Sequence, residues 1–252
     1  MVCSTFFARV LHVQQQRYTV ASLGITVWII YTTDHLIDVH KLSREASSQR
    51  HRFHQKNFNS LLLALIVGIG ADCALSFFIL KPILYWGIGL ALAVGVYLCF
   101  QQRLLWFKEL LVSFVYAAGV LLPTMALMTT ELSGSEIILI VFFTLTAFIN
   151  LVLFSWYDQE SDSRDSQISL VTIIGNEQVK RILVILFLIQ AILFMGLVLD
   201  STYRIEASIL FLMNVALLII FRFPDFFSDK AYYRTVGDTV FLFPLPYLLL
   251  NG

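Results

Sequence analysis

The sequence contains few cysteines and few charged residues, and both shortages narrow the class of protein. The 252 residues include three cysteines, which are scattered and form no Cys-x-x-Cys pair, so no disulfide framework or cysteine-ligated metal site is indicated. Charged residues make up 13% of the chain, about half the share in soluble domains, and hydrophobic residues make up 58%. With a mean hydropathy of +0.80, this composition excludes a soluble domain, a disordered chain and a nucleic-acid-binding protein.

Eight long apolar runs account for most of the hydrophobic residues. A helix needs about 20 residues to cross a bilayer, and most of the runs reach about this length. They are continuous rather than alternating, which favours helices over barrel strands. The sequence therefore predicts an all-α, polytopic transmembrane helix bundle embedded in a lipid bilayer. The predicted spans are Tyr18–Thr33, Ser60–Leu80, Ile83–Phe100, Leu110–Thr130, Ile137–Tyr157, Ile182–Leu199, Ala207–Phe221 and Val236–Leu250.

The first 17 residues contain an apolar patch that is too short to span a bilayer. Arg9, His12 and three glutamines interrupt this patch. We interpret the segment as a re-entrant or interfacial stub, or as a shortened additional N-terminal helix. Residues 1–252 together are expected to form a single membrane domain.

Positive charge is concentrated in alternate loops. With eight spans, 13 of the 17 Lys and Arg residues lie in four loops on one side, namely 39–57, 101–109, 158–181 and 222–235. The formal net charge is zero, so the pattern of charge, and not its sum, carries information. The positive-inside rule places these loops in the cytoplasm. We therefore expect a multi-pass protein of a bacterial inner membrane, with these loops on the cytoplasmic side.

Two pairs of carboxylates occupy matching positions in the chain. Asp34 and Asp38 end the first span, Asp158 and Asp162 end the fifth, and the offset is 124 residues for both members. The Asp-x-x-x-Asp spacing places both side chains of a pair on one helix face, about 6 Å apart along the axis, where like charges repel. One such pair is typical of a solvated helix end, but two matched pairs favour a shared polar site. Their carboxylate oxygens are ligands that favour Mg²⁺, which proteins hold through carboxylates and substrate phosphates.

The matching positions also indicate an internal repeat. The first acidic pair precedes the polar loop 39–57, the second lies at the start of the polar loop 158–181, and three further spans follow each loop. The halves, about 18–130 and 137–250, are therefore expected to be parallel repeats related by an axis along the membrane normal. The two loops would lie over the mouth of the shared site.

The second acidic pair lies within a longer motif. From Asp158 to Gly175 the sequence reads DQESDSRDSQISLVTIIG. It resembles the second motif of the UbiA superfamily of intramembrane prenyltransferases, which reads D-x-E-G-D-x-K-x-G-x-x-T-L-x-x-x-x-G. Asp158, Glu160, Asp162, Leu170 and Gly175 are in register with that motif without a gap.

The first motif of the same family, N-D-x-x-D-x-x-x-D, is matched in part. Asp34 and Asp38 fall on its last two carboxylates, whereas Ile30 and Tyr31 stand where the family has Asn and Asp. The resemblance covers about residues 18–250. It implies a UbiA-like bundle that transfers an isoprenyl group, with Mg²⁺ as cofactor, from a prenyl diphosphate to a lipophilic acceptor such as an aromatic or quinone precursor.

The resemblance also implies roles for individual residues. The four aspartates of the two pairs are expected to ligate Mg²⁺ and to be the catalytic residues, with the metals neutralising the departing diphosphate. Asn150 has two interpretations, as a cavity-lining group or as an interhelical hydrogen bond. The expected diphosphate- and substrate-binding residues are Arg164, Arg103, Lys108, Tyr97 and Asn150.

Two other functions fit the same pattern. One is a UbiA-type terpene cyclase, in which the allylic cation is captured within its own chain. The other is a non-enzymatic membrane carrier with parallel repeats. Carriers place their sites near the bilayer midplane, whereas these carboxylates lie at helix ends, which favours an enzyme.

Several other polar residues each have two interpretations. The basic cluster of residues 50–56 is interpreted as an anchor on anionic lipid or as a group of cations that attracts diphosphate. Asp72, in the middle of a span, is a functional-site candidate or a hydrogen-bonded core group. Asp238 is expected to cap its helix or to pair with Arg234, four residues earlier, unless it serves a site.

Overall fold

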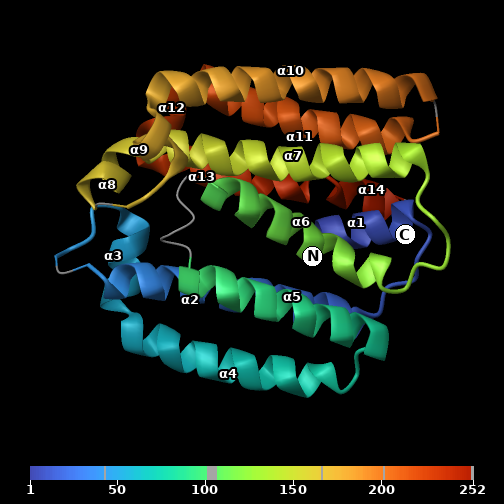
Figure 1. The fold of residues 1–252 in the computed structure, drawn as a ribbon, viewed down its shortest axis with the longest axis horizontal. Helices are drawn as coiled ribbons and strands as arrows, with labels where there is room; N and C mark the ends of the chain where they lie inside the picture. The colour runs from blue at the N-terminus through green and yellow to red at the C-terminus, as the bar shows by residue number, and fades with distance from the viewer. Residues whose placement is uncertain (43, 101–106, 166, 201, 251–252) are drawn as a thin grey trace.

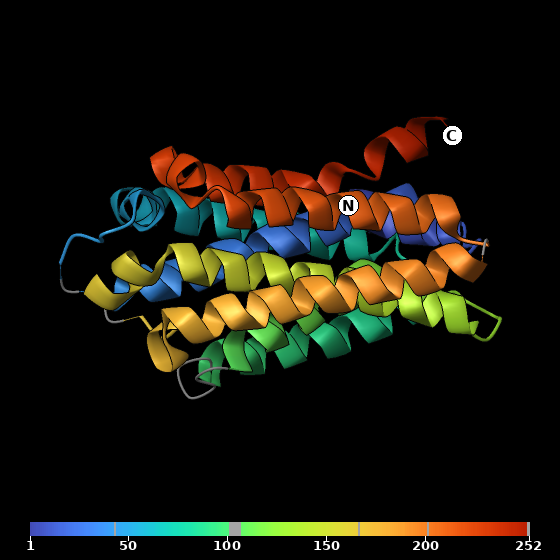
Figure 2. The same cartoon turned by 90° about the horizontal axis from the view of Figure 1, so that it is seen from above.

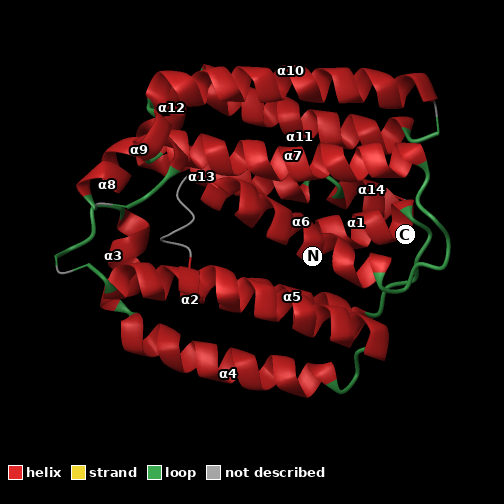
Figure 3. Cartoon of the chain, viewed as in Figure 1, coloured by secondary structure: helices red, strands yellow, loops and turns green. Residues whose placement is uncertain are grey.

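The computed structural model describes residues 1–42, 44–100, 107–165, 167–200 and 202–250. Every regular element in these ranges is a helix, as Figure 3 shows. The long helices lie side by side along one axis of the molecule (Figure 1). This arrangement confirms the predicted all-helical bundle.

Seven helices are long and apolar enough to cross a membrane. They coincide with the first seven predicted runs, so the prediction of a multi-pass membrane protein is confirmed at this level. The outer faces of the bundle carry exposed apolar side chains such as Val67, Trp86 and Ile192, as contact with lipid requires. The seven helices are α2 (Arg17–His40), α4 (Phe58–Ser76), α5 (Lys81–Phe100), α6 (Lys108–Met125), α7 (Gly134–Tyr157), α10 (Asn176–Asp200) and α11 (Arg204–Arg222).

The eighth predicted span, Val236–Leu250, is not a continuous helix. The chain there is divided into α13 (Tyr232–Thr239), η4 (Val240–Leu242) and α14 (Leu245–Leu250). The break falls next to two prolines of this run, which cannot donate a backbone hydrogen bond to a preceding turn. Figure 2 shows that the pieces still follow one another along the bundle toward the C-terminus.

The N-terminal segment forms a short helix, α1 (Val2–Val10), inside the bundle. Phe6 and Phe7 are completely buried, and the ring of Phe7 packs edge-on against Phe143, with 5.1 Å between centroids. The helix ends before His12, whose φ of 54° is left-handed. The apolar patch within residues 1–17 thus forms a short helix buried in the core, in line with the interpretation of a shortened N-terminal helix.

The remaining short helices gather at one end of the bundle, on the left in Figure 1. We call this the loop end, and it comprises the connections 41–57, 158–175 and 223–231. They include α3 (Gln49–Lys56), α8 (Gln159–Arg164), α9 (Leu170–Ile174), α12 (Pro224–Ser228) and η3 (Asp229–Ala231).

The two proposed halves both begin with a long helix, which is followed by a connection that contains short helices. Helices α2 and α7 each contain 24 residues and run to the loop end, where α2 carries Asp34 and Asp38 and Asp158 follows the last residue of α7. Helix α2 packs on α4, and α7 packs on α10. The symmetry axis between the halves stays a prediction. Of the seven long helices, α7 is the most deeply buried, and it positions one wall of the site described below.

Candidate functional site

A cavity of about 730 Å³ lies at the loop end, between α2, α6, α7 and α13. Seven of the nine sequence-predicted site residues line it. Its wall carries more acidic than basic side chains, which favours a bound cation. The acidic residues are Asp34, Asp38, Glu109, Asp158, Asp162 and Asp238, and the basic ones are Arg50, Lys108 and Arg234. Tyr97 and Asn150 complete the set of predicted residues at the wall.

The other two predicted residues are not brought to this wall. Arg164 is absent from the cavity lining, its side chain is 64% exposed, and it pairs with Glu160 one turn earlier on α8. The short α8 turns this side of the loop toward solvent, so the geometry does not support the prediction that Arg164 binds diphosphate. Arg103 lies outside the described residues.

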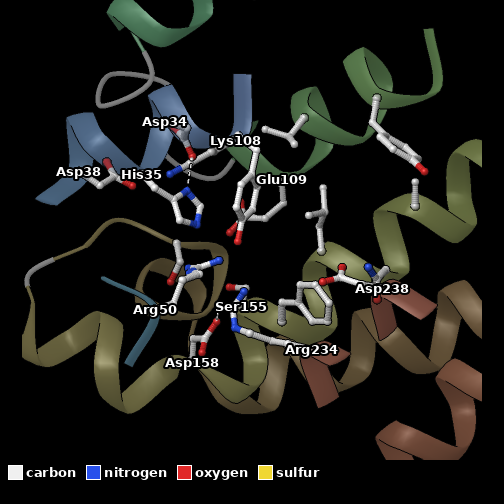
Figure 4. A pocket seen from close by; sticks show the side chains of 18 of the residues that line it. Asp34, His35, Asp38, Arg50, Lys108, Glu109, Ser155, Asp158, Arg234 and Asp238 are labelled. Atoms are coloured by element: carbon white, nitrogen blue, oxygen red, sulfur yellow. Dashed lines mark hydrogen bonds and ion pairs between the residues drawn. The ribbon is translucent and has the colours of Figure 1, made fainter. Parts of the chain in front are cut away.

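The first acidic pair faces the cavity from α2 (Figure 4). Asp34 and Asp38 are one helical turn apart. The Oδ1 atom of Asp34 is buried and has no hydrogen-bond partner, and Nδ1 of His35 lies 3.8 Å from its other oxygen. A buried carboxylate oxygen without a partner is costly, so Asp34 has an oxygen available for a ligand.

The second acidic pair lies at a break between two helices. Helix α7 ends at Tyr157, and Asp158 has φ −82° and ψ 1°, so α8 begins in a new direction. Asp158 is 8% exposed. The hydroxyl of Tyr233 donates a hydrogen bond to its Oδ1, and the guanidinium of Arg234 donates to its Oδ2. Figure 4 shows the Asp158–Arg234 pair at the wall opposite α2.

Arg234 pairs with Asp158 and not with Asp238, which was one of the interpretations of Asp238 from the sequence. Asp238 lines the cavity, in line with the interpretation that it serves a site. The reason for the pairing with Asp158 is a close approach of α13 to α7. A Cβ on Gly237 would lie 2.6 Å from Oδ1 of Asn150 and 2.7 Å from the ring of Phe154. Only glycine allows this approach. It brings the preceding turn of α13, with Arg234, to Asp158.

Asn150 reaches the cavity with a buried Oδ1 that has no hydrogen-bond partner. This geometry fits the cavity-lining interpretation and not an interhelical hydrogen bond through that oxygen. Asn150 and Tyr97 are both buried. They face the cavity from α7 and α5, so the wall combines residues from both halves of the chain.

Asp165 and Glu109 are two buried carboxylates that the sequence did not indicate. Each accepts hydrogen bonds from a loop at the site. The backbone N–H and hydroxyl of Ser47 both donate to Asp165, over 3.0 and 2.6 Å. The backbone N–H of Leu170 donates to Oε1 of Glu109 over 2.6 Å, at the start of α9. The first contact ties the loop after α2 to the loop after α7. No local pattern marks these pairs, because their members are 118 and 61 residues apart.

Burial also sets the protonation of the groups on the loops. It lowers the pKa of His51 to about 4, with the nearby Arg50 and Arg234 adding to the effect. Burial lowers the pKa of Arg234 to about 9, so this side chain stays charged at neutral pH. At neutral pH Arg234 thus adds a positive charge to the cavity wall, while His51 is neutral.

Asp162 is expected to make stability depend on pH. Burial raises its pKa to about 6, against an ordinary value of 3.8, while Ser169, Arg50 and Lys108 oppose the rise. Between about pH 4 and 6 the folded state then binds more protons, so this group's contribution to stability falls as pH rises. Asp162→Asn removes that contribution. We expect its melting temperature to exceed that of the wild type by a few degrees at pH 7 and by little at pH 4.

The comparison of the variant with the wild type separates the effect of Asp162 from that of His51. His51 has an opposite effect over the same range, because its folded pKa lies below its unfolded value, but it is present in both proteins. Thermal unfolding of both proteins in one detergent, at pH 4 to 7, measures the difference. A difference that is constant with pH would contradict the raised pKa.

The residues present fit one Mg²⁺ ion better than two. Asp34 and Asp38 offer carboxylate oxygens from one helix face, and Mg²⁺ is commonly bound by one or two carboxylates, several waters and substrate phosphates. Asp158 has both oxygens engaged by Tyr233 and Arg234, so it does not fit a ligand role in this arrangement. Among the described residues, no group of three or more His, Cys, Asp or Glu side chains converges on one point.

A second cavity of about 580 Å³ adjoins the first. Its lining is mostly apolar and comes from α2, α4, α5 and α6. Asp72 is at its wall, where the hydroxyls of Ser22 and Thr26 donate to its carboxylate over 2.5 and 2.7 Å. Asp72 is thus hydrogen-bonded and also lines a cavity, so both interpretations of this residue stay predictions. Six residues line both cavities, namely Val27, Tyr31, Asp34, Tyr97, Val112 and Tyr116.

The fold and the site together define a multi-pass helical membrane protein with a charged cavity at one end that adjoins an apolar one. Comparisons of the chain with models of known protein families, with curated proteins and with solved structures found no match.

Proposed function

We propose that this protein is a UbiA-type intramembrane prenyltransferase, which transfers an isoprenyl group from a prenyl diphosphate to a lipophilic, aromatic or quinone-precursor acceptor. The observation that carries the proposal is the pair of adjoining cavities. Residues from both acidic motifs line the charged cavity, and the apolar cavity shares a wall with it. A molecule with an anionic head and a hydrocarbon tail fits this combination.

The apolar cavity supplies affinity for the tail. Burial of hydrocarbon contributes about 0.8 kcal/mol per CH₂ group, so a tail of several isoprene units would be held firmly. The shared wall contains Tyr31, Tyr97 and Tyr116. These tyrosines border both cavities, where the head of such a molecule would meet its tail.

The charged cavity supplies the groups for ionisation of the diphosphate. Lys108 would bind a diphosphate oxygen, and Asp34 and Asp38 would hold one Mg²⁺ ion. When bound, the ion would neutralise part of the charge on the departing diphosphate. Departure of diphosphate breaks the C–O bond, takes the bonding electron pair and leaves an allylic cation. Attack by the acceptor forms the new bond to carbon, and the acceptor then loses a proton to the released diphosphate or to water.

Aromatic side chains around the cavity would stabilise that cation and exclude water from it. Trp28, Tyr31 and Tyr97 face the cavity from α2 and α5, and Phe154 and Phe241 face it from the opposite side. Ring faces attract cations, and an apolar wall limits capture of the cation by water. We propose a bacterial inner membrane as the location, with the loop end in the cytoplasm.

Product analysis tests this function. The purified chain in lipid nanodiscs is incubated with Mg²⁺ and prenyl diphosphates of several lengths, with and without aromatic acceptors, and the products are identified by mass spectrometry. We expect a prenylated acceptor that forms only with Mg²⁺. Membrane extracts of cells with and without the protein would then identify the natural acceptor.

The same experiment distinguishes the other functions. A hydrocarbon or alcohol product formed equally without acceptor would assign a terpene cyclase. If no diphosphate is released with or without acceptor, and an intact ligand moves across the bilayer, the protein is a carrier and the proposed enzyme is rejected.

A further inference from the structure

The geometry at Asp158 conflicts with a second metal ion. A Mg²⁺ ion held by Asp158 and Asp162 would have to displace Tyr233 or Arg234 from a buried carboxylate. It would also lie next to the guanidinium of Arg234, which repels it. On this wall Arg234 therefore already supplies the positive charge that a second metal ion would supply.

Arg234 is held in place by more than its ion pair. Its guanidinium carbon lies 5.1 Å from the ring centre of Phe154 and 5.6 Å from that of Tyr233. The ring of Tyr233 in turn stacks on that of Tyr157, with 4.3 Å between centroids. The Arg234 side chain is 22% exposed, so it is largely enclosed but borders the cavity. This enclosure limits the movement of the guanidinium at the cavity wall.

A second arginine reaches the same space from another element. Arg50 projects from α3 into the cavity, between α2 and the Asp158–Arg234 pair (Figure 4). Its Nε is buried and has no hydrogen-bond partner. A buried N–H donor without an acceptor is costly, so Arg50 has a donor available for an anion.

We propose that Arg50 and Arg234 form an anion site that replaces the second metal ion, so that one Mg²⁺ at Asp34 and Asp38 and two arginines bind the diphosphate. This inference rests on the proposed prenyltransferase function and specifies its site. Asp158 is then a positioning residue for Arg234 and not a metal ligand. Arginine suits this role because its charge is permanent and its planar group binds two phosphate oxygens at once.

Counting bound metal ions tests the proposal. Mn²⁺ replaces Mg²⁺ as the probe, inorganic pyrophosphate serves as the anion, and electron paramagnetic resonance measures free Mn²⁺ over the full chain in detergent micelles. We expect one Mn²⁺ per chain in the presence of pyrophosphate. Asp34→Asn should abolish this binding, whereas Asp158→Asn combined with Arg234→Gln should retain it.

Pyrophosphate affinity provides the second readout. Loss of a charged hydrogen-bond donor should weaken pyrophosphate binding about tenfold to a hundredfold in Arg50→Gln and in the Asp158→Asn, Arg234→Gln double variant. The double variant removes both charges of the pair, so no unpaired carboxylate is left buried. Arg234→Lys keeps one charge and should show an intermediate loss. Arg52→Gln, two residues along α3, and Arg222→Gln, an exposed cation at the loop end, are matched controls that should bind normally.

Two results would overturn the proposal. One is two Mn²⁺ ions per wild-type chain that fall to one in the double variant. The other is unchanged pyrophosphate affinity in both Arg50→Gln and the double variant. A wild type that binds one Mn²⁺ and pyrophosphate as described, but forms no product from any prenyl diphosphate, would reject the proposed function and leave the anion site in place.

Discussion

Asp34→Asn is expected to lower the rate of prenyl transfer by at least about a hundredfold, and to leave the fold intact. Charge neutralisation by a metal contributes several kcal/mol to such a reaction, and each 1.36 kcal/mol is tenfold in rate. The substitution keeps the shape of the side chain. Asp34 makes no hydrogen bond through its buried Oδ1, so little structure depends on its charge.

Stability and rate should therefore separate in this variant. We expect the free energy of unfolding to change by less than about 1 kcal/mol, or to increase, since repulsion with Asp38 is relieved. Product formation at saturating prenyl diphosphate and thermal unfolding in the same detergent measure the two quantities. Asp229→Asn, an exposed carboxylate at the loop end, is the control for loss of charge alone.

Opposite results would assign Asp34 differently. A variant that unfolds readily but retains transfer when stabilised by lipid would make Asp34 a structural group. A variant with normal rate and normal stability would remove it from the site. Mg²⁺ and pyrophosphate should raise the melting temperature of the wild type and should do so much less for Asp34→Asn.

The sequence contained enough information to locate the cavity. Asp34 and Asp38 share one face of a helix because of their spacing, and the offset of 124 residues placed Asp158 at the corresponding end of another long helix. Helix ends at one side of a bundle come together when the spans between them are even in number. For this reason a pattern of charges and apolar runs was sufficient to predict that both pairs face one cavity.

The partner of Asp158 could not be obtained in the same way. By sequence spacing, Asp238 is a suitable ion-pair partner for Arg234, because it lies one turn further along the same helix. The pair that forms instead joins residues 76 positions apart and depends on how closely α13 approaches α7 at Gly237. Sequence spacing describes faces of single helices, but it does not give distances between helices.

The continuity of the last span was predicted wrongly for a different reason. Composition alone assigned residues 236–250 to one helix, because apolar residues dominate the run. Two prolines within the run were a usable signal that its helix would be interrupted. The burial of α1 had a weaker signal, since Phe6 and Phe7 are as suitable for lipid contact as for a protein core.

Substitutions at Asp158 and Arg234 are expected to be strongly coupled. Asp158→Asn or Arg234→Gln alone should each destabilise the protein by about 3–5 kcal/mol, because each leaves an uncompensated charge in a largely buried site. The double variant should lose less than the sum of the two. This expectation for Asp158→Asn is opposite in sign to that for Asp34→Asn, although both residues begin an Asp-x-x-x-Asp pair.

The chain contains a matched control for this coupling. Glu160 and Arg164 form an ion pair in the same loop, but their side chains are 81% and 64% exposed, against 10% and 22% for Asp158 and Arg234. Exposed i,i+4 pairs contribute about 0.3–0.5 kcal/mol. A double-mutant cycle on each pair, measured by thermal or denaturant unfolding without metal or diphosphate, compares them directly.

The result of the cycle decides what Asp158 does before any ligand binds. A large coupling in the Asp158–Arg234 cycle, with almost none in the Glu160–Arg164 cycle, would show that the ion pair is formed in the ligand-free protein. Additive effects at Asp158 and Arg234 would mean that the carboxylate is free, as a metal ligand must be. Because no metal is present in this measurement, the answer does not depend on whether the protein transfers a prenyl group.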